Sequence, residues 1–196
     1  MRLRQICDTP KLSMEDYDGE SGKLESLREL LEQLQDGEHR VLIFSQFRGM
    51  LDIIEQELNQ MGMESFKITG STPAKERQEM TKAFNQGERS AFLISLKAGG
   101  VGLNLTGANT VILVDLWWNP AVEAQAIGRA HRIGQERNVK VYRMITRGTI
   151  EEKIQELQDT KRNLVSTILD GAESRSSLSM EEIREILGIS SESLEK

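Results

Sequence analysis

Two arginines and a glutamine in one short segment have the residue types and spacing to bind phosphate. Gln125, Arg129 and Arg132 lie within QAIGRAHRIGQ, separated by four and three residues. On a helix this spacing places the three side chains along one polar stripe. Two guanidinium groups without a neighbouring acid suit a polyphosphate, which they bind through paired hydrogen bonds. The ordinary alternative is a solvated surface stripe, and this segment alone does not separate the two.

A glycine-rich segment, SLKAGGVGLNLTGAN at 95–109, is a second candidate. Gly99, Gly100 and Gly102 allow the backbone to come close to a phosphate or a sugar, although a plain turn would also use them. The chain contains no GxxxxGK[ST] motif, and the spacing of Gly100, Gly102 and Gly107 does not match GxGxxG. The segment is therefore neither a Walker A loop nor a dinucleotide fingerprint.

The segment DLWWNP at 115–120 carries both tryptophans of the chain. In an extended backbone Trp117 and Trp118 face opposite sides, so that one of them can be exposed. Packing is the usual role of a tryptophan. An exposed indole beside a phosphate groove would instead suit contact with a nucleic-acid strand.

Metal-dependent and acyl-transfer chemistry are poorly supported by the residues available. The chain has two histidines, His39 and His131, and one cysteine, Cys7, with no HExxH, no ligand-spaced His/Cys set and no GxSxG elbow. We expect His131 to be structural. The single cysteine excludes an internal disulfide, and no apolar run approaches the ~20 residues that a membrane span needs. These properties predict an intracellular protein.

The net charge of −6 is unevenly distributed along the chain. Residues 14–38 hold nine acids and two bases, and residues 170–196 hold seven acids and three bases. Residues 121–147 instead hold six bases and two acids, a local charge of +4. A basic block is more often a solvated face than a phosphate site, so it gains meaning only from the motifs around it.

Short apolar runs alternate with amphipathic segments, which predicts an open, mainly parallel α/β sheet with helices on both faces. We expect strands at 40–45, 65–69, 91–95, 110–115 and 139–146. We expect helices at 21–37, 49–62, 73–85, 121–133 and 149–171. Pro73 suits a first helical turn and Thr149 a helix cap. Ligands of such sheets bind at the carboxyl ends of the strands, where the candidate segments lie.

Four parts of the chain follow from this pattern. They are a leading segment at 1–20, the sheet-forming lobe at 21–148, a long helix at 149–171 and a tail at 172–196. The tail is acidic and rich in serine, and SMEEIREILG within it predicts a short helix with Ser179 as its cap. Its composition is typical of a partly disordered linker or a partner-docking segment.

Taken together, the motifs resemble the C-terminal RecA-like lobe of the Swi/Snf-type ATPases within helicase superfamily two. VLIFSQFRGMLDIIEQEL resembles motif IV, and GSTPAKERQEMTKAFN resembles the DNA-contacting segment that follows it. SLKAGGVGLNLTGAN resembles motif V, and DLWWNPAVEAQAIGRAHRIGQ runs through motif VI. The resemblance covers roughly residues 21–169, with LRQIC near the start, and the order of the motifs is more specific than any one of them.

The resemblance implies a role for each matching residue. Arg129 and Arg132 match the two motif VI arginines that approach the γ-phosphate across the interface between two lobes, and Gln125 matches the glutamine that opens this motif. Gly102 and Asn104 match motif V positions near the nucleotide. The positions that match residues in contact with DNA phosphates or grooves are Ser45, Gln46, Gly70, Ser71, Thr72, Ser95, Lys97 and Trp118.

Several features depart from the family pattern. The usual Asn-His-Pro after LRQIC is Asp8-Thr9-Pro10, which leaves the packing of that segment open, and Lys97 replaces a common arginine. The Walker A loop, the Asp-Glu box and the adenine-binding glutamine segment belong to the N-terminal lobe and are absent here. We therefore expect ATP with Mg²⁺ to be bound mainly by that other lobe, and Met1 to be a fragment boundary.

The implied function is the C-terminal lobe of an ATP-dependent double-stranded DNA translocase, inactive as an isolated chain. The implied partners are double-stranded DNA, the N-terminal RecA-like lobe of the same polypeptide, and RNA polymerase or another DNA-bound protein, without a membrane. The segments SLKAGG and WWNP favour a prokaryotic member of the family, which would be cytoplasmic and associated with the nucleoid. Two alternatives remain open, a free-standing nucleotide-binding module and a degenerate lobe that makes protein contacts through its acidic ends.

Overall fold

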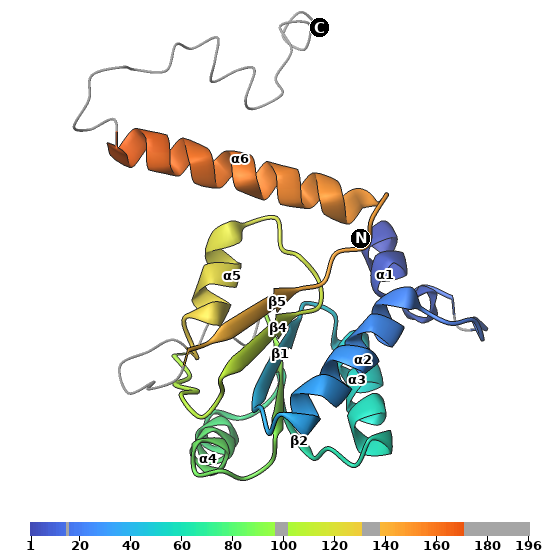
Figure 1. Ribbon diagram of the computed structural model, residues 1–196, viewed down its shortest axis with the longest axis vertical. Coiled ribbons are helices and arrows are strands. Elements are labelled where there is room, and N and C mark those ends of the chain that lie inside the picture. Colours follow the sequence, from blue (N-terminus) through green and yellow to red (C-terminus); the bar gives the residue numbers. More distant parts are fainter. Residues whose placement is uncertain (15, 97–101, 131–137, 171–196) are drawn as a thin grey trace, which may run out of the picture. The chain divides into compact units, whose positions relative to one another are not determined.

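A five-stranded parallel sheet forms the centre of the protein (Figure 1). The computed structural model describes residues 1–14, 16–96, 102–130 and 138–170, and at 162 and 164–170 it describes the backbone alone. The strands are β1 (Val41–Ser45), β2 (Ser65–Ile68), β3 (Ala91–Ser95), β4 (Thr110–Leu113) and β5 (Lys140–Arg143). Their order is β2-β3-β1-β4-β5, and every neighbouring pair is parallel. The predicted strands and their parallel pairing are confirmed.

The helices connect these strands and flank them. They are α1 (Arg2–Asp8), the 3-10 helix η1 (Pro10–Leu12), α2 (Gly22–Asp36), α3 (Arg48–Gln60), α4 (Ala74–Asn85), α5 (Pro120–Ile127) and α6 (Ile150–Asp170). The side chain of Ser21 accepts a hydrogen bond from the backbone N–H of Leu24 and caps α2, as its residue type favours. Asn119 caps α5 in the same way, with Pro120 at its first position.

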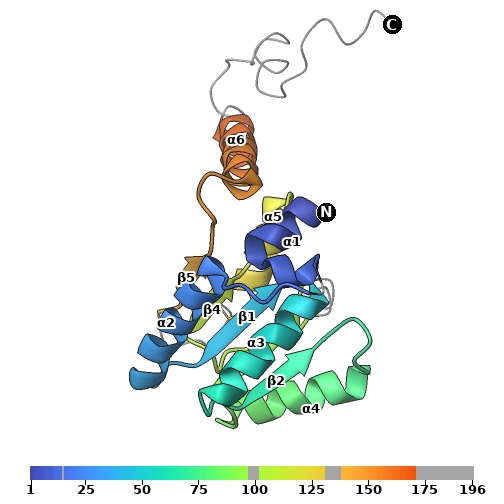
Figure 2. The ribbon, with the colours of Figure 1, turned by 90° about the vertical axis from the view of Figure 1, so that its right-hand side faces the viewer.

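Two apolar layers hold the helices against the sheet, because successive side chains of a strand face opposite sides. Val41 and Ile43 of β1 pack with α2 and α3, while Leu42 and Phe44 pack with α4 and α5. Figure 1 shows α2 and α3 on one side of the sheet and α4 and α5 on the other, and Figure 2 shows α2 and α3 in front of the strands. All five residues of β1 are buried, as expected for a central parallel strand.

The structure corrects three details of the predicted helices. The helix predicted at 121–133 ends at Ile127, and Arg129 lies in the hydrogen-bonded turn that follows. Pro73 stands at the N-cap of α4, before its first turn. The short helix α1 was not predicted, since Arg2–Asp8 offers too few residues for a periodic apolar pattern to be recognised.

Two compact units divide the chain, Met1–Ile154 and Gln155–Lys196. The sheet and the first turn of α6 belong to the first unit, and the rest of α6 belongs to the second. The predicted tail at 172–196 and its short helix lie outside the described residues. The division into the four predicted parts stays a prediction. No helix in the described parts of the chain has the length and apolar character to cross a membrane.

Candidate functional site

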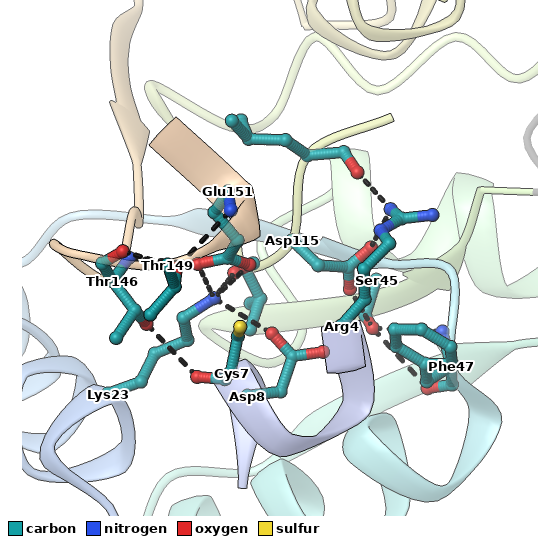
Figure 3. Close-up of polar contacts among 12 residues, drawn as sticks. Arg4, Cys7, Asp8, Lys23, Ser45, Phe47, Asp115, Thr146, Thr149 and Glu151 are labelled. Carbon is teal, nitrogen blue, oxygen red and sulfur yellow. Dashed lines mark hydrogen bonds and ion pairs between the residues drawn. The ribbon is translucent and has the colours of Figure 1, made fainter. Parts of the chain in front are cut away.

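The carboxyl edge of the sheet is organised around the buried carboxylate of Asp115, which follows β4. The hydroxyl of Ser45 donates a hydrogen bond to its Oδ2 atom, and the backbone N–H of Gln46 lies 3.2 Å from each of its oxygens. The side-chain amide of Gln46 also donates to Asp115 Oδ1. The loop after β1 and the loop after β4 are therefore held by one carboxylate (Figure 3).

Burial raises the pKa of Asp115, and the hydrogen bonds donated by Ser45 and Gln46 act against this rise by stabilising the carboxylate. Ser45 itself has no exposed surface. Its hydroxyl oxygen accepts from the backbone N–H of Phe47 at 3.1 Å while its proton is donated to Asp115. In this conformation the Ser45 hydroxyl is thus occupied within the protein.

Arg4 of α1 reaches the same edge from the N-terminal segment. Its Nη2 atom donates to the carbonyl oxygen of Leu116 and lies 4.0 Å from Asp115 Oδ1. Its guanidinium carbon lies 5.8 Å from the ring centre of Phe47 and 5.9 Å from those of Trp117 and Trp118. Each of these separations is within the range of a cation–π contact.

The two tryptophans differ in exposure, as the sequence predicted. Trp117 is half-buried and packs against the apolar layer on the α4 and α5 face of the sheet. Trp118 is 44% exposed, so its indole remains accessible at the edge. The backbone N–H of Trp117 donates to Glu123 at 2.9 Å, and Glu123 also accepts from Arg143 of β5 at 3.3 Å. The start of α5 is thereby tied to the tryptophan segment.

The loop after β2 forms a compact polar turn. The Thr69 hydroxyl lies 3.0 Å from that of Ser71, and the Thr69 N–H donates to the Thr72 hydroxyl at 3.0 Å. Arg77 of α4 donates to the carbonyl oxygen of Thr72 at 2.7 Å and to that of Gly70 at 3.1 Å. Gly70 and Ser71 are exposed, so this turn presents small polar groups to solvent.

Two of the predicted nucleotide-contacting residues lie on a different part of the lobe. Gly102 and Asn104 are exposed and line a pocket of about 410 Å³ beside the last turns of α4. The side-chain amide of Asn85 donates to the carbonyl oxygen of Asn104 at 2.8 Å. A Cβ atom at Gly102 would meet no described atom within 4 Å, so the packing of this lobe does not require glycine there.

Arg129 and Gln125 do not form the predicted stripe. Arg129 is 1% exposed, whereas Gln125 is exposed on α5, because the helix ends between them. Arg129 Nη1 donates to the carbonyl oxygen of Leu103 at 3.5 Å, and its own carbonyl accepts from the N–H of Leu105 at 3.0 Å. The glycine-rich segment and the arginine-bearing turn are therefore neighbours. Arg132 lies outside the described residues.

A buried ionic cluster lies below the edge, where α1, α2 and the start of α6 meet (Figure 3). Lys23 Nζ donates to Asp8 Oδ1 at 2.8 Å, to Glu151 Oε1 at 2.6 Å and to the carbonyl oxygen of Val114 at 2.9 Å. Burial and the nearby Asp115 carboxylate raise the pKa of Asp8 to about 8. Asp8, which stands where the family usually has asparagine, is thus a partner of Lys23.

The structure sorts the predicted site residues into two groups. The residues matched to DNA contacts lie at the carboxyl ends of β1 to β4, with Ser95 buried at the end of β3 and Lys97 outside the described residues. Of the residues matched to ATP contacts, Gly102, Asn104 and Arg129 lie where the segment 102–105 meets the turn after α5, Gln125 is exposed on α5, and Arg132 is outside the described residues. Among the described residues no group of three or more His, Cys, Asp or Glu side chains is placed to hold a metal ion.

Four supporting residues were not predicted. Two of them have a signal in the sequence: Asp115 is an acid soon after an apolar strand, and Lys23 is a charged residue within the apolar pattern of α2. Arg77 and Arg4 have no signal of this kind, because their partners are backbone carbonyl oxygens, which every residue type carries. Because a buried charge is expected to be paired, these two patterns predict a polar partner for Lys23 and another for Asp115.

Fold and site together define a RecA-like α/β lobe with a polar carboxyl edge and a second polar site beside the glycine-rich segment. The model of the helicase conserved C-terminal domain matches residues 22–134, and this chain belongs to that family. The C-terminal part of the Fun30 ATPase domain superposes with a TM-score of 0.68 and 34% identity, over 92% of this chain and 56% of that one. The predicted fold class is confirmed.

Two curated relatives agree with this family. Helicase SWR1 of Mycosarcoma maydis is 45% identical over 165 residues, which are 84% of this chain and 9% of that protein. The putative ATP-dependent helicase/translocase YwqA of Bacillus subtilis is 42% identical over 195 residues, 96% of this chain and 21% of that protein. The predicted kinship with Swi/Snf-type ATPases is confirmed. Because fungal and bacterial relatives are similarly close, the prokaryotic origin stays a prediction.

Proposed function

We propose that this chain is the C-terminal lobe of an ATP-dependent double-stranded DNA translocase of the Swi/Snf type. The observation that carries the proposal is the membership of residues 22–134 in the helicase C-terminal domain family, together with the placement of the matching motifs at two separate sites. In this proposal one site grips the DNA backbone, and the other completes an ATP site formed mainly by an N-terminal lobe.

The proposed DNA surface is the carboxyl edge of β2, β1 and β4. It offers the turn at 70–72, the amide of Gln46 and the exposed indole of Trp118. With β3 between β2 and β1, this edge extends over four adjacent β-strands. Neighbouring β-strands are about 5 Å apart, so the edge spans roughly 15 Å and can follow several phosphates of one DNA strand. Ser45 and Ser95 are buried, and we assign them to holding this edge together.

The proposed ATP-facing surface is formed by Gly102, Asn104, Gln125 and the turn that carries Arg129. Open space at Gly102 and the exposed amides of Asn104 and Gln125 fit one side of a nucleotide. Arginines that reach the transferred phosphoryl group typically raise turnover by ~10³–10⁵. Because Arg129 is buried in this conformation, we propose that the turn after α5 rearranges when the two lobes close.

These residues fit half of an ATP site, and Mg²⁺ would be held by the N-terminal lobe. When bound, ATP with Mg²⁺ would supply the phosphoanhydride bond that is hydrolysed; its binding would draw the arginines of this lobe in, and hydrolysis would release them. The residues of this chain contribute positive charge and orientation. The long helix α6 resembles the family's brace, and we propose that it contacts the N-terminal lobe. Double-stranded DNA is the proposed partner, and RNA polymerase or another DNA-bound protein is the proposed target, at the nucleoid in a bacterial cell.

Complementation tests this function. We expect the purified chain to hydrolyse no ATP and to bind DNA weakly, and we expect DNA-stimulated hydrolysis when it is joined to its N-terminal lobe. ATP hydrolysis by this chain alone would overturn the proposal in favour of a free-standing nucleotide-binding module. A joined protein that binds DNA and ATP without hydrolysis would instead support the degenerate, non-enzymatic lobe.

A further inference from the structure

We propose that Asp115 is a positioning residue that holds the loop after β1 and the loop after β4 as a single rigid edge for DNA. The inference rests on the proposed function and adds to it a residue that touches no DNA. Asp115 is 1% exposed, and its partners include Gln46, which we place on the DNA surface.

Gln46 is held by Asp115 through both its backbone and its side chain. Its backbone N–H lies 3.2 Å from each carboxylate oxygen, and its side-chain amide donates to Oδ1. A long polar side chain that is ordered before binding loses less conformational freedom when it meets a phosphate. Fixing one such side chain is worth roughly 3- to 10-fold in affinity.

The segment with Trp118 is held at the same edge through Arg4. Arg4 donates to the carbonyl oxygen of Leu116 and places its guanidinium against the rings of Phe47, Trp117 and Trp118. It also lies 4.0 Å from Asp115, at the limit of an ion pair. Arg4 thus connects the two loops from the side of α1, while Asp115 connects them from within.

The donors around position 115 require an aspartate. The Ser45 hydroxyl, the Gln46 N–H and the Gln46 amide are all donors that point at this side chain. A carboxylate has two oxygens that accept only, whereas an asparagine has one acceptor oxygen and an NH₂ group that would face a donor. Asp115→Asn therefore keeps the shape of the side chain and removes its ability to hold all three donors.

The test uses Asp115→Asn in the two-lobe protein, with Asp52→Asn as the matched control. Asp52, whose side chain is 46% exposed on α3, accepts a hydrogen bond from Lys67 at 2.9 Å and takes no part in the hydrogen bonds that hold Asp115. We expect the DNA concentration that gives half-maximal ATPase activity to rise about tenfold in Asp115→Asn, with turnover at saturating DNA within twofold. Asp52→Asn should leave both quantities unchanged.

A double-mutant cycle separates positioning from general stability. If Asp115 acts through Gln46, then adding Asp115→Asn to the Gln46→Ala variant should raise the half-saturating DNA concentration by less than about twofold. Full additivity, or an unchanged half-saturating DNA concentration in Asp115→Asn, overturns the inference. Should Asp115→Asn fail to fold, Arg4→Lys is the deciding variant, and it should raise the half-saturating DNA concentration about threefold. If the wild-type two-lobe protein shows no stimulation by DNA, the proposed function itself fails.

Discussion

Replacing Lys23 with methionine should destabilise the chain far more than the same change at Lys67. Both lysines contact two carboxyl groups, Asp8 and Glu151 for Lys23, and Asp52 and Glu55 for Lys67. The Lys23 side chain is 3% exposed and its two acidic partners are fully buried, whereas the Lys67 side chain is 25% exposed. The main difference between the two sites is therefore burial.

The magnitude follows from what each substitution leaves behind. Methionine at 23 keeps the volume but leaves the Glu151 carboxylate and the Val114 carbonyl without the ammonium that contacts them at 2.6 and 2.9 Å. Removing one partner of a buried ion pair costs about 3–5 kcal/mol. A half-exposed pair contributes about 0–1 kcal/mol. For a chain of this size the Lys23 variant should melt about 6–20 °C lower, and the Lys67 variant at most about 4 °C lower.

Urea and thermal denaturation of the purified chain, followed by far-UV circular dichroism, measure this difference. Adding Glu151→Gln to Lys23→Met should recover part of the loss, because the unpaired buried charge is then removed. If Lys23→Met and Lys67→Met lose the same stability within about 1 kcal/mol, or if Glu151→Gln makes the double variant worse, the reasoning is refuted.

Two further predictions concern pH and glycine. The raised pKa of Asp8, about 8 against an ordinary 3.8, means that the folded chain holds a proton that the unfolded chain releases, so stability should fall as pH rises from about 4 to about 8. The Asp8→Asn variant should lack this fall in pH-dependent urea titrations, and an unchanged pH profile would contradict the assignment. Gly70→Ala and Gly102→Ala should change stability by less than about 0.5 kcal/mol and still weaken DNA or ATP binding, since each site is open in this lobe. Gly107→Ala should cost about 1–3 kcal/mol, because its Cβ would lie 2.8 Å from Arg40 and 3.0 Å from Asn85; equal stability of all three variants would argue against this.

The sheet was predictable because its signal is local. Runs such as VLIFS and AFLIS are apolar except for their final serine, as is typical of buried parallel strands, and turn residues separate them from amphipathic helices. The strand order was not predicted, since it depends on pairing between segments such as Val41–Ser45 and Ala91–Ser95 that are distant along the chain.

The site was only partly predictable. The motifs located the loops, and the structure places the segment 102–105 next to the turn with Arg129. The prediction that Gln125 and Arg129 share one helical face was wrong, because α5 ends at Ile127 and Arg129 lies beyond it. Burial of Ser45 and the cluster around Lys23 depend on tertiary packing, which spacing along the chain does not reveal.

We propose that this lobe completes an ATP site with its arginines, so the rate of ATP turnover should depend on them. DNA-stimulated hydrolysis is measured in the two-lobe protein carrying Arg129→Lys or Arg132→Lys, with the exposed Arg147→Lys as control. We predict a loss of about 10³-fold or more in turnover for the first two variants, with ATP binding within a few-fold and the control unchanged. Normal turnover in both Arg129→Lys and Arg132→Lys would contradict the claim.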